Sequence, residues 1–162
     1  GLIDPDKVIF GGQADERTLR IQPTIMDRVT ADDAVMQEEI FGPLLPVIAY
    51  DSIDEALAFV NGREHPLALY LFSEDPALQK RVLASVPFGG GCINDTIVHL
   101  ATSRMGFGGV GHSGMGSYHG KKSFDTFSHE KSVLKKSTRI DMPVRYMPYT
   151  PLKDRLLRIF LR

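Results

Sequence analysis

The sequence predicts an α/β fold with a mostly parallel sheet and flanking helices. Three short apolar segments, "LLPVIAY" (44–50), "LALYLFS" (67–73) and "GGCINDTIVHL" (90–100), are separated by two helical patterns. This strand–helix–strand–helix–strand order is typical of parallel sheets. The segments are apolar without strict alternation, which suits strands that are covered on both faces. With 162 residues, 43% of them hydrophobic, the chain is long enough for one domain with a core.

Two extended segments precede this pattern. The segment "KVIFGG" (7–12) predicts a short strand that ends in a turn. The segment "TLRIQPTIMDRV" (18–29) also predicts extended backbone, and its Pro23 limits how central that strand can be in a sheet.

The two helical patterns carry their own start signals. The first helix, at residues 53–62, follows Ser52 or Asp51 as its cap. The second, at residues 75–86, begins with Asp75 as the cap and a proline at the first helical position.

The chain changes character after residue 100. The segment "MGFGGVGHSGMGSYHG" (105–120) is rich in glycine and predicts a loop with unusual backbone angles or close approaches. A short helix is expected at 121–127 and an exposed, charged strand at 128–136. The end, "YTPLKDRLLRIFLR" (149–162), predicts a basic amphipathic helix.

Composition excludes several classes of protein. The formal net charge of −1 gives no general reason to bind nucleic acid or an anionic membrane. No apolar run approaches the length of about 18 residues that a membrane span needs. The single cysteine, Cys92, rules out a disulfide within the chain and favours a reducing, cytoplasmic environment.

Three features could carry chemistry, and for each the structural interpretation is favoured. The spacing Gly106-x-Gly108-x-x-Gly111 matches a dinucleotide fingerprint but lacks the strand and helix that should flank it, which favours a structural or pocket-lining loop. Cys92 is the only thiol, and its apolar surroundings favour a small core residue over a nucleophile. The histidine spacings match no metal site, although His119 within the glycine loop is of interest.

The stretch "VMQEEIFGPLLPV" (35–47) raises a different possibility. A carboxylate can accept both hydroxyls of a vicinal diol, as a ribose offers. A nearby phenylalanine offers a flat wall for a planar ring. From these residues alone, a solvated pair of glutamates before a strand is the favoured interpretation, and Asp32 and Asp33 are expected in a solvated turn.

Longer motifs change that balance. The segments "MQEEIFGPLLPV" (36–47) and "GFGGVGHSGMGSYHGKKSFDTFSHEKSV" (106–133) resemble the NAD(P)-dependent aldehyde dehydrogenases, and "INDTIVH" (93–99) points to the class 3, fatty-aldehyde-like branch. The resemblance implies the C-terminal part of the catalytic domain at residues 1–127. It further implies an oligomerisation arm strand at 128–138, through which a homodimer forms, and a tail at 139–162.

The resemblance also assigns roles near the cofactor, NAD or NADP. It implies that Glu39 holds the ribose of the nicotinamide half and that Phe41 lies near the nicotinamide. Glu38 is expected to be solvated or structural.

For the aldehyde substrate, the resemblance implies an apolar tunnel lined by Phe107. Residues near its opening would be Leu100, Ala101 and His119. Such a tunnel suits hydrophobic aldehydes.

In this family a cysteine thiolate attacks the aldehyde, hydride passes to the nicotinamide, and a glutamate activates water to release the acid. The nucleophile, its oxyanion asparagine and the glutamate lie upstream of the part that this chain resembles. The chain is therefore expected to be inactive alone, with no catalytic residue of its own and no membrane span. Two alternatives stay open: a naturally truncated, non-catalytic assembly module, and an independent dinucleotide-binding domain built on residues 106–111.

Overall fold

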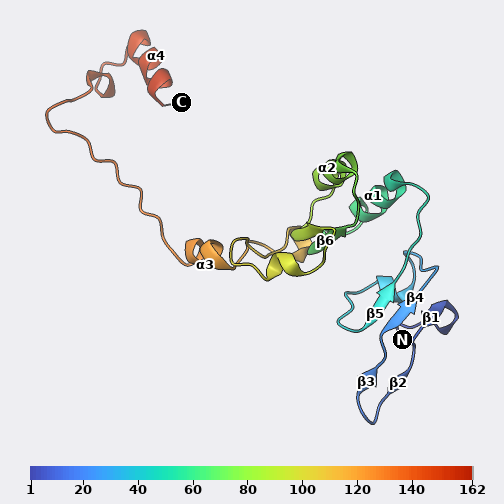
Figure 1. The fold of residues 1–162 in the computed structure, drawn as a ribbon. Helices are drawn as coiled ribbons and strands as arrows, with labels where there is room; N and C mark the ends of the chain where they lie inside the picture. The colour runs from blue at the N-terminus through green and yellow to red at the C-terminus, as the bar shows by residue number, and fades with distance from the viewer. Residues whose placement is uncertain (162) are drawn as a thin grey trace. The chain divides into compact units, whose positions relative to one another are not determined.

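The computed structural model describes residues 1–161, which divide into two units, residues 1–124 and the segment from Asp125 onward (Figure 1). The first contains all the strands among the described residues, and the second is helical and irregular.

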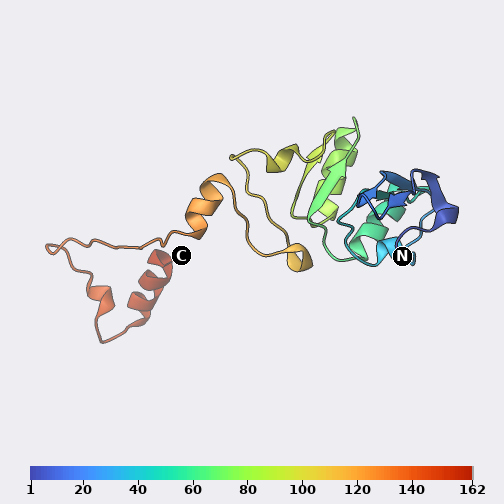
Figure 2. The same ribbon diagram turned by 90° about the horizontal axis from the view of Figure 1, so that it is seen from below.

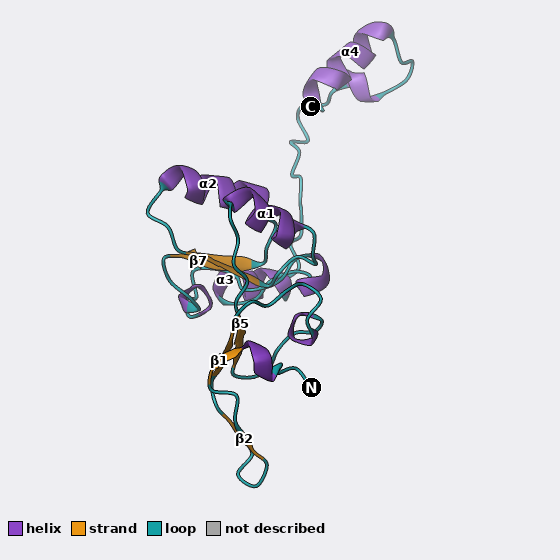
Figure 3. Cartoon of the chain, turned by 90° about the vertical axis from the view of Figure 1, so that its right-hand side faces the viewer, coloured by secondary structure: helices purple, strands orange, loops and turns teal. Residues whose placement is uncertain are grey.

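The first sheet of unit 1 has three short strands in the order β1–β4–β5. β1 (Val8–Phe10) pairs antiparallel with β4 (Thr24–Met26), and β4 pairs parallel with β5 (Leu44–Pro46). Between β1 and β4, the antiparallel pair β2 (Ala14–Asp15) and β3 (Arg20–Ile21) forms a small hairpin (Figure 3).

A small core packs beside this sheet. Met26, Val29 and Val35 are buried, and five half-buried apolar residues pack against them: Val8, Met36, Ile40, Leu44 and Ile48. Val35 belongs to the short 3-10 helix η2 (Ala34–Met36), so the core fixes the start of the loop that follows this helix.

The second part of unit 1 is a βαβ element. α1 (Ile53–Asn61) leads into β6 (Ala68–Leu71), and α2 (Pro76–Ser85) then crosses over to β7 (Gly90–Ile93), which pairs parallel with β6. Both helices lie on the same side of the β6–β7 pair (Figures 1 and 3).

The helix start signals are confirmed. Ser52 Oγ accepts the Glu55 N–H at 3.2 Å, and an Asp75 carboxylate oxygen accepts the Ala77 N–H at 2.8 Å. These bonds satisfy amide groups that have no partner within a first helical turn.

One prediction about the sheet is wrong, because the strands do not form a single, mostly parallel sheet. β5 and β6 are not neighbours, and β1 is antiparallel. Pro46 gives a physical reason. The Val47 N–H donates to Met26 of β4, so the missing N–H of Pro46 lies on the outer side of β5. That side lacks the donor for another strand.

The expected strand at 90–100 is also shorter than predicted. It ends at Ile93, after which Asn94 and Ile97 take positive φ values of 59° and 64° and the 3-10 helix η3 (Val98–Leu100) follows. The apolar composition of this segment predicts burial, but it does not predict the turns at Asn94 and Ile97.

The glycine loop is held by close backbone contacts. Phe107 and Tyr118 form an isolated antiparallel bridge, with N–H···O distances of 2.9 and 3.0 Å. A Cβ on Gly108 would lie 2.1 Å from the carbonyl oxygen of Gly116, so a larger residue does not fit there. α3 (Gly120–Thr126) follows, close to the predicted short helix.

The second unit contains the 3-10 helix η5 (Pro143–Arg145) and α4 (Pro151–Phe160). Within the predicted stretch 149–162, α4 confirms an amphipathic helix over residues 151–160, shown in red beside the C-terminus in Figure 2. The predicted strand at 128–136 is absent, because this segment has no strand partner among the described residues. Within residues 1–161, no helix is both long and apolar enough to cross a membrane.

Candidate cofactor site

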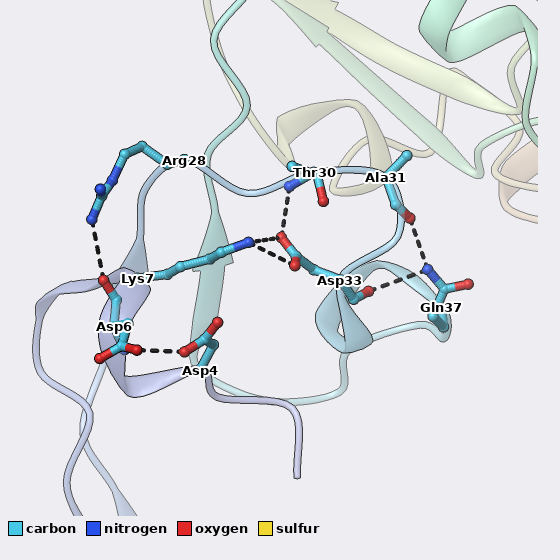
Figure 4. A network of polar contacts seen from close by, with 8 residues as sticks. All are labelled: Asp4, Asp6, Lys7, Arg28, Thr30, Ala31, Asp33 and Gln37. Carbon is cyan, nitrogen blue, oxygen red and sulfur yellow. Dashed lines mark hydrogen bonds and ion pairs between the residues drawn. The ribbon is translucent and has the colours of Figure 1, made fainter.

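The loop after η2 carries Glu38 and Glu39, and a polar network anchors its base. Gln37 Nε2 donates to the carbonyl oxygens of Ala31 and Asp33 at 2.7 and 3.2 Å. The Met36 N–H donates to the Asp33 carbonyl at 2.9 Å. The hydrogen bonds of the Gln37 side chain thus help to set the backbone conformation just before Glu38 (Figure 4).

Asp33 is the centre of this network. Both its carboxylate oxygens accept from Lys7 Nζ, at 2.6 and 2.5 Å, and one of them accepts the Thr30 N–H at 2.6 Å (Figure 4). The hydrogen bond from Lys7 and then the Thr30 amide hold the pKa of the Asp33 carboxyl below its usual value. The expectation of a solvated turn is therefore wrong for Asp33, which joins the first strand segment to the loop.

Glu39 lines two adjoining cavities. The first, of about 860 Å³, is lined by residues 35–40, Leu44, Pro46 and residues 62–64. The second, of about 540 Å³, is lined by Glu39, residues 64–68, His112 and Ser113. Within residues 1–161, no hydrogen bond or ion pair occupies the Glu39 carboxylate, so both its oxygens can accept from a ligand.

The other residues of the motif lie differently. Glu38 lines only the first of these cavities. Phe41 is 93% exposed and lines neither of them. The structure thus offers the Phe41 ring as an open apolar face beside the loop that carries Glu39.

Two of the residues assigned to the aldehyde tunnel, Phe107 and His119, belong to an aromatic cluster. We define this cluster as Tyr70, His99, Phe107, Tyr118 and His119. The Phe107 ring lies 6.0 Å from that of His119 in a stacked arrangement, and 5.9 Å from those of Tyr118 and His99. Phe107 and His119 are therefore brought together from opposite ends of the glycine loop.

Leu100 and Ala101 directly follow His99, a member of this cluster. Leu100 ends η3 and is half-buried, whereas Ala101 is exposed. Neither residue, nor Phe107 or His119, lines the two cavities that Glu39 borders.

Sequence reasoning missed two contacts. Cys92 Sγ lies 3.6 Å from Nδ1 of His99, whose ring is buried and whose Nε2 has no hydrogen-bond partner within the described residues. The Arg63 guanidinium donates to the Met36 carbonyl next to the glutamate loop. No sequence signal marks either pair, because each joins separate elements.

Two alternative kinds of site have little support. Among residues 1–161, no three His, Cys, Asp or Glu side chains are grouped so that they could hold a metal ion. The spacing Gly106-x-Gly108-x-x-Gly111 lies at a β-bridge and a three-residue 3-10 turn, without the strand and helix of a dinucleotide fingerprint.

Comparison with known proteins places these features in a family. The sequence profile described as "Aldehyde dehydrogenase family" matches residues 5–133. The chain is 58% identical over 142 residues to the 4,4'-diaponeurosporen-aldehyde dehydrogenase of Staphylococcus aureus, covering 88% of this chain and 31% of that protein. It is 49% identical over 153 residues to aldehyde dehydrogenase family 3 member H1 of Arabidopsis thaliana, covering 94% and 32%.

Solved structures agree. The substrate-bound state of Staphylococcus aureus AldH superposes with a TM-score of 0.87 at 54% identity, over 97% of this chain and 34% of that one. A Mycobacterium tuberculosis aldehyde dehydrogenase complexed with NAD+ gives 0.70 at 30% identity, over 80% and 27%. The chain thus spans about a third of the length of its relatives. It belongs to the aldehyde dehydrogenase family, in its class 3 branch.

Proposed function

We propose that this chain forms part of an aldehyde dehydrogenase that oxidises hydrophobic aldehydes to carboxylic acids with NAD or NADP. The observation that carries the proposal is the unoccupied carboxylate of Glu39 at the border of two cavities, within the motif that the family resemblance assigns to cofactor binding. Two of the relatives support the proposal. One is named as a 4,4'-diaponeurosporen-aldehyde dehydrogenase, and the other is an aldehyde dehydrogenase complexed with NAD+.

The residues present fit the nicotinamide half of the cofactor. In the proposal Glu39 accepts hydrogen bonds from the two ribose hydroxyls, which needs the free acceptor oxygens that the structure provides. The exposed face of Phe41 would pack beside the ring and exclude water from it. The bound nicotinamide would supply the hydride acceptor.

The aromatic cluster supplies the apolar wall for the substrate. In the proposal Phe107 lines the path of the aldehyde, and Leu100, Ala101 and His119 lie near its opening. The stacking of His119 on Phe107 supports a shared surface, because aromatic faces bury apolar chains well.

Glu39 can be tested in the full-length dehydrogenase that carries this chain. We expect Glu39→Gln to weaken NAD(P) binding about tenfold or more, because charge-assisted hydrogen bonds are worth about 1.5–3 kcal/mol. Glu38→Gln is the matched control, since it removes the same charge one residue away, and isothermal titration calorimetry measures both. Equal affinities for Glu39→Gln and the unmodified enzyme would refute the role of Glu39.

The 162-residue chain itself is expected to be catalytically inactive. Cys92 is its only thiol, and it lies half-buried in β7. The assay combines the isolated chain with NAD(P) and a long-chain aldehyde and follows absorbance of the reduced cofactor. Turnover above the protein-free blank would contradict this expectation.

We also propose a cytoplasmic homodimer that forms through the arm at 128–138. Residues 125–162 carry nine Lys and Arg against four Asp and Glu, whereas residues 1–124 carry ten against sixteen. Opposite net charges on the two segments support association between copies. Deletion of residues 128–162 is then expected to convert the dimer into a monomer in solution, and a truncated chain that remains dimeric would exclude the arm.

A second candidate is a naturally truncated, non-catalytic assembly module of the same family. The intact mass of the polypeptide in its source cell separates the two. A species of 18.0 kDa would favour the module. A species about three times larger would favour the dehydrogenase.

A further inference from the structure

Arg63 lies where α1 ends and faces the loop that carries Glu39. The Gly62 N–H donates to the Ala58 carbonyl at 3.0 Å, and the Arg63 N–H donates to the Val60 carbonyl at 3.2 Å. These backbone bonds fix the start of the Arg63 side chain relative to the helix. Arg63 lines the 860 Å³ cavity together with Glu38 and Glu39.

Two contacts fix the guanidinium itself. Its carbon lies 5.6 Å from the centre of the half-buried Phe59 ring, one helical turn back along α1. Its Nη2 donates to the carbonyl oxygen of Met36, the last residue of η2. A planar guanidinium can stack on a ring and donate in its own plane at once, which an ammonium group cannot do.

The Met36 carbonyl is the group through which Arg63 holds the loop that carries Glu39. Met36 is the last residue of a three-residue 3-10 helix, so its carbonyl oxygen has no partner within that helix. Met36 lies three residues before Glu39, and the hydrogen bonds of Gln37 and Asp33 anchor the same turn. The loop is thus held from the core on one side and from α1 by Arg63 on the other.

We infer that Arg63 is a positioning residue, which holds the Glu38–Glu39 segment at the geometry that Glu39 needs for its ligand. This inference rests on the proposed role of Glu39 in cofactor binding. Arg63 acts through the Met36 carbonyl and the loop, and it need not touch the cofactor.

The attachment can be measured without any cofactor. In the 162-residue chain, we expect Arg63→Met to speed hydrogen exchange of the Met36 and Gln37 amides about fivefold or more, because a lost hydrogen bond to a charged donor costs at least about 1 kcal/mol. Arg81→Met is the matched control, since Arg81 pairs with Asp54 on α1 far from η2 in sequence. Unchanged exchange at Met36 and Gln37 in Arg63→Met would overturn the inference.

Coupling to Glu39 is tested in the full-length dehydrogenase. We expect Arg63→Met alone to weaken NAD(P) binding about fivefold. In an enzyme that already carries Glu39→Gln, Arg63→Met should weaken binding little further, because Arg63 acts through the contact between Glu39 and the cofactor. Arg63→Lys should restore only part of the affinity, since it keeps the charge and loses the stacking. Additive losses in the double variant would overturn the inference.

These outcomes separate the two levels of the argument. If Glu39→Gln weakens binding and Arg63→Met does not, the positioning role fails and the proposed function stands. If Glu39→Gln has no effect while Arg63→Met loosens the Met36 and Gln37 amides, the attachment stands and the cofactor role of Glu39 fails.

Discussion

Neighbouring residues of the same type can have quite different roles, as Asp32 and Asp33 show. Asp33 accepts three hydrogen bonds from Lys7 and Thr30, whereas the side chain of Asp32 is exposed. The sequence "DD" predicts only a polar turn, because the partner that distinguishes the second carboxylate lies 26 residues earlier in the chain.

This difference predicts a pH dependence of stability. Because the pKa of Asp33 is lowered in the folded chain, its contribution is present above the pKa of an unfolded aspartate, about 3.9, and is lost as the pH falls further. Asp33→Asn should therefore lower Tm at pH 7 and make little difference at the lowest pH that the fold survives. Asp32→Asn is the control. A Tm difference for Asp33→Asn that stays constant down to that pH would show that the Lys7 contact does not act through charge.

At the scale of elements, the β6–β7 pair depends on the absence of a side chain at Gly91. Gly91 pairs with Leu69, and a Cβ at Gly91 would lie 1.9 Å from the Leu69 carbonyl oxygen. Strand propensity would favour a larger residue there, so the close approach of the two backbones explains the glycine.

We therefore expect Gly91→Ala to lower the free energy of unfolding by about 3 kcal/mol, since the two strands must move apart. Gly42→Ala is the control, with an expected change of about 0.5 kcal/mol or less, because its Cβ would meet only Ile40 Cγ2 at 3.9 Å. Urea denaturation followed by circular dichroism measures both. Similar midpoints for the two variants would rule out the steric explanation.

The elements also show what a sequence can and cannot predict. Helix α2 was predictable, because its cap and first-turn proline are local signals. The division of the strands between separate sheets was not, because pairing depends on contacts between distant segments. The same holds at the site. The position of Glu39 in a recognisable motif was predictable. The contribution of Arg63 to the same cavity was not, because Arg63 follows a separate helix.

For the whole molecule, the boundary between the units predicts a pattern of proteolysis. Lys131, Lys135 and Lys136 lie in the segment without helix or strand, whereas Arg81 lies within α2. Exposed chain without regular structure is the preferred substrate of proteases. Trypsin at low protein concentration should therefore cut first at these three lysines, as mass spectrometry of the fragments would show.

The matched variant replaces the three lysines with glutamine, which should move the first cut to Arg139, an exposed residue of the same irregular segment, without changing the digestion of unit 1. If copies pair through the arm, a higher protein concentration should slow cleavage at these lysines. First cleavage at Arg81 would mean that the segment at 128–138 is protected even at low concentration.

Two of the three small sheets of unit 1, β1–β4–β5 and β6–β7, have strand edges that pair with no other strand among residues 1–161. β1 and β5 are both edge strands, and β6 and β7 have only each other. Backbone groups on such edges recruit other extended chains unless something covers them. In a cell, chaperones and proteases would act on any copy of this polypeptide whose strand edges stay uncovered. The cellular half-life of the polypeptide would therefore depend on whether another chain covers these edges.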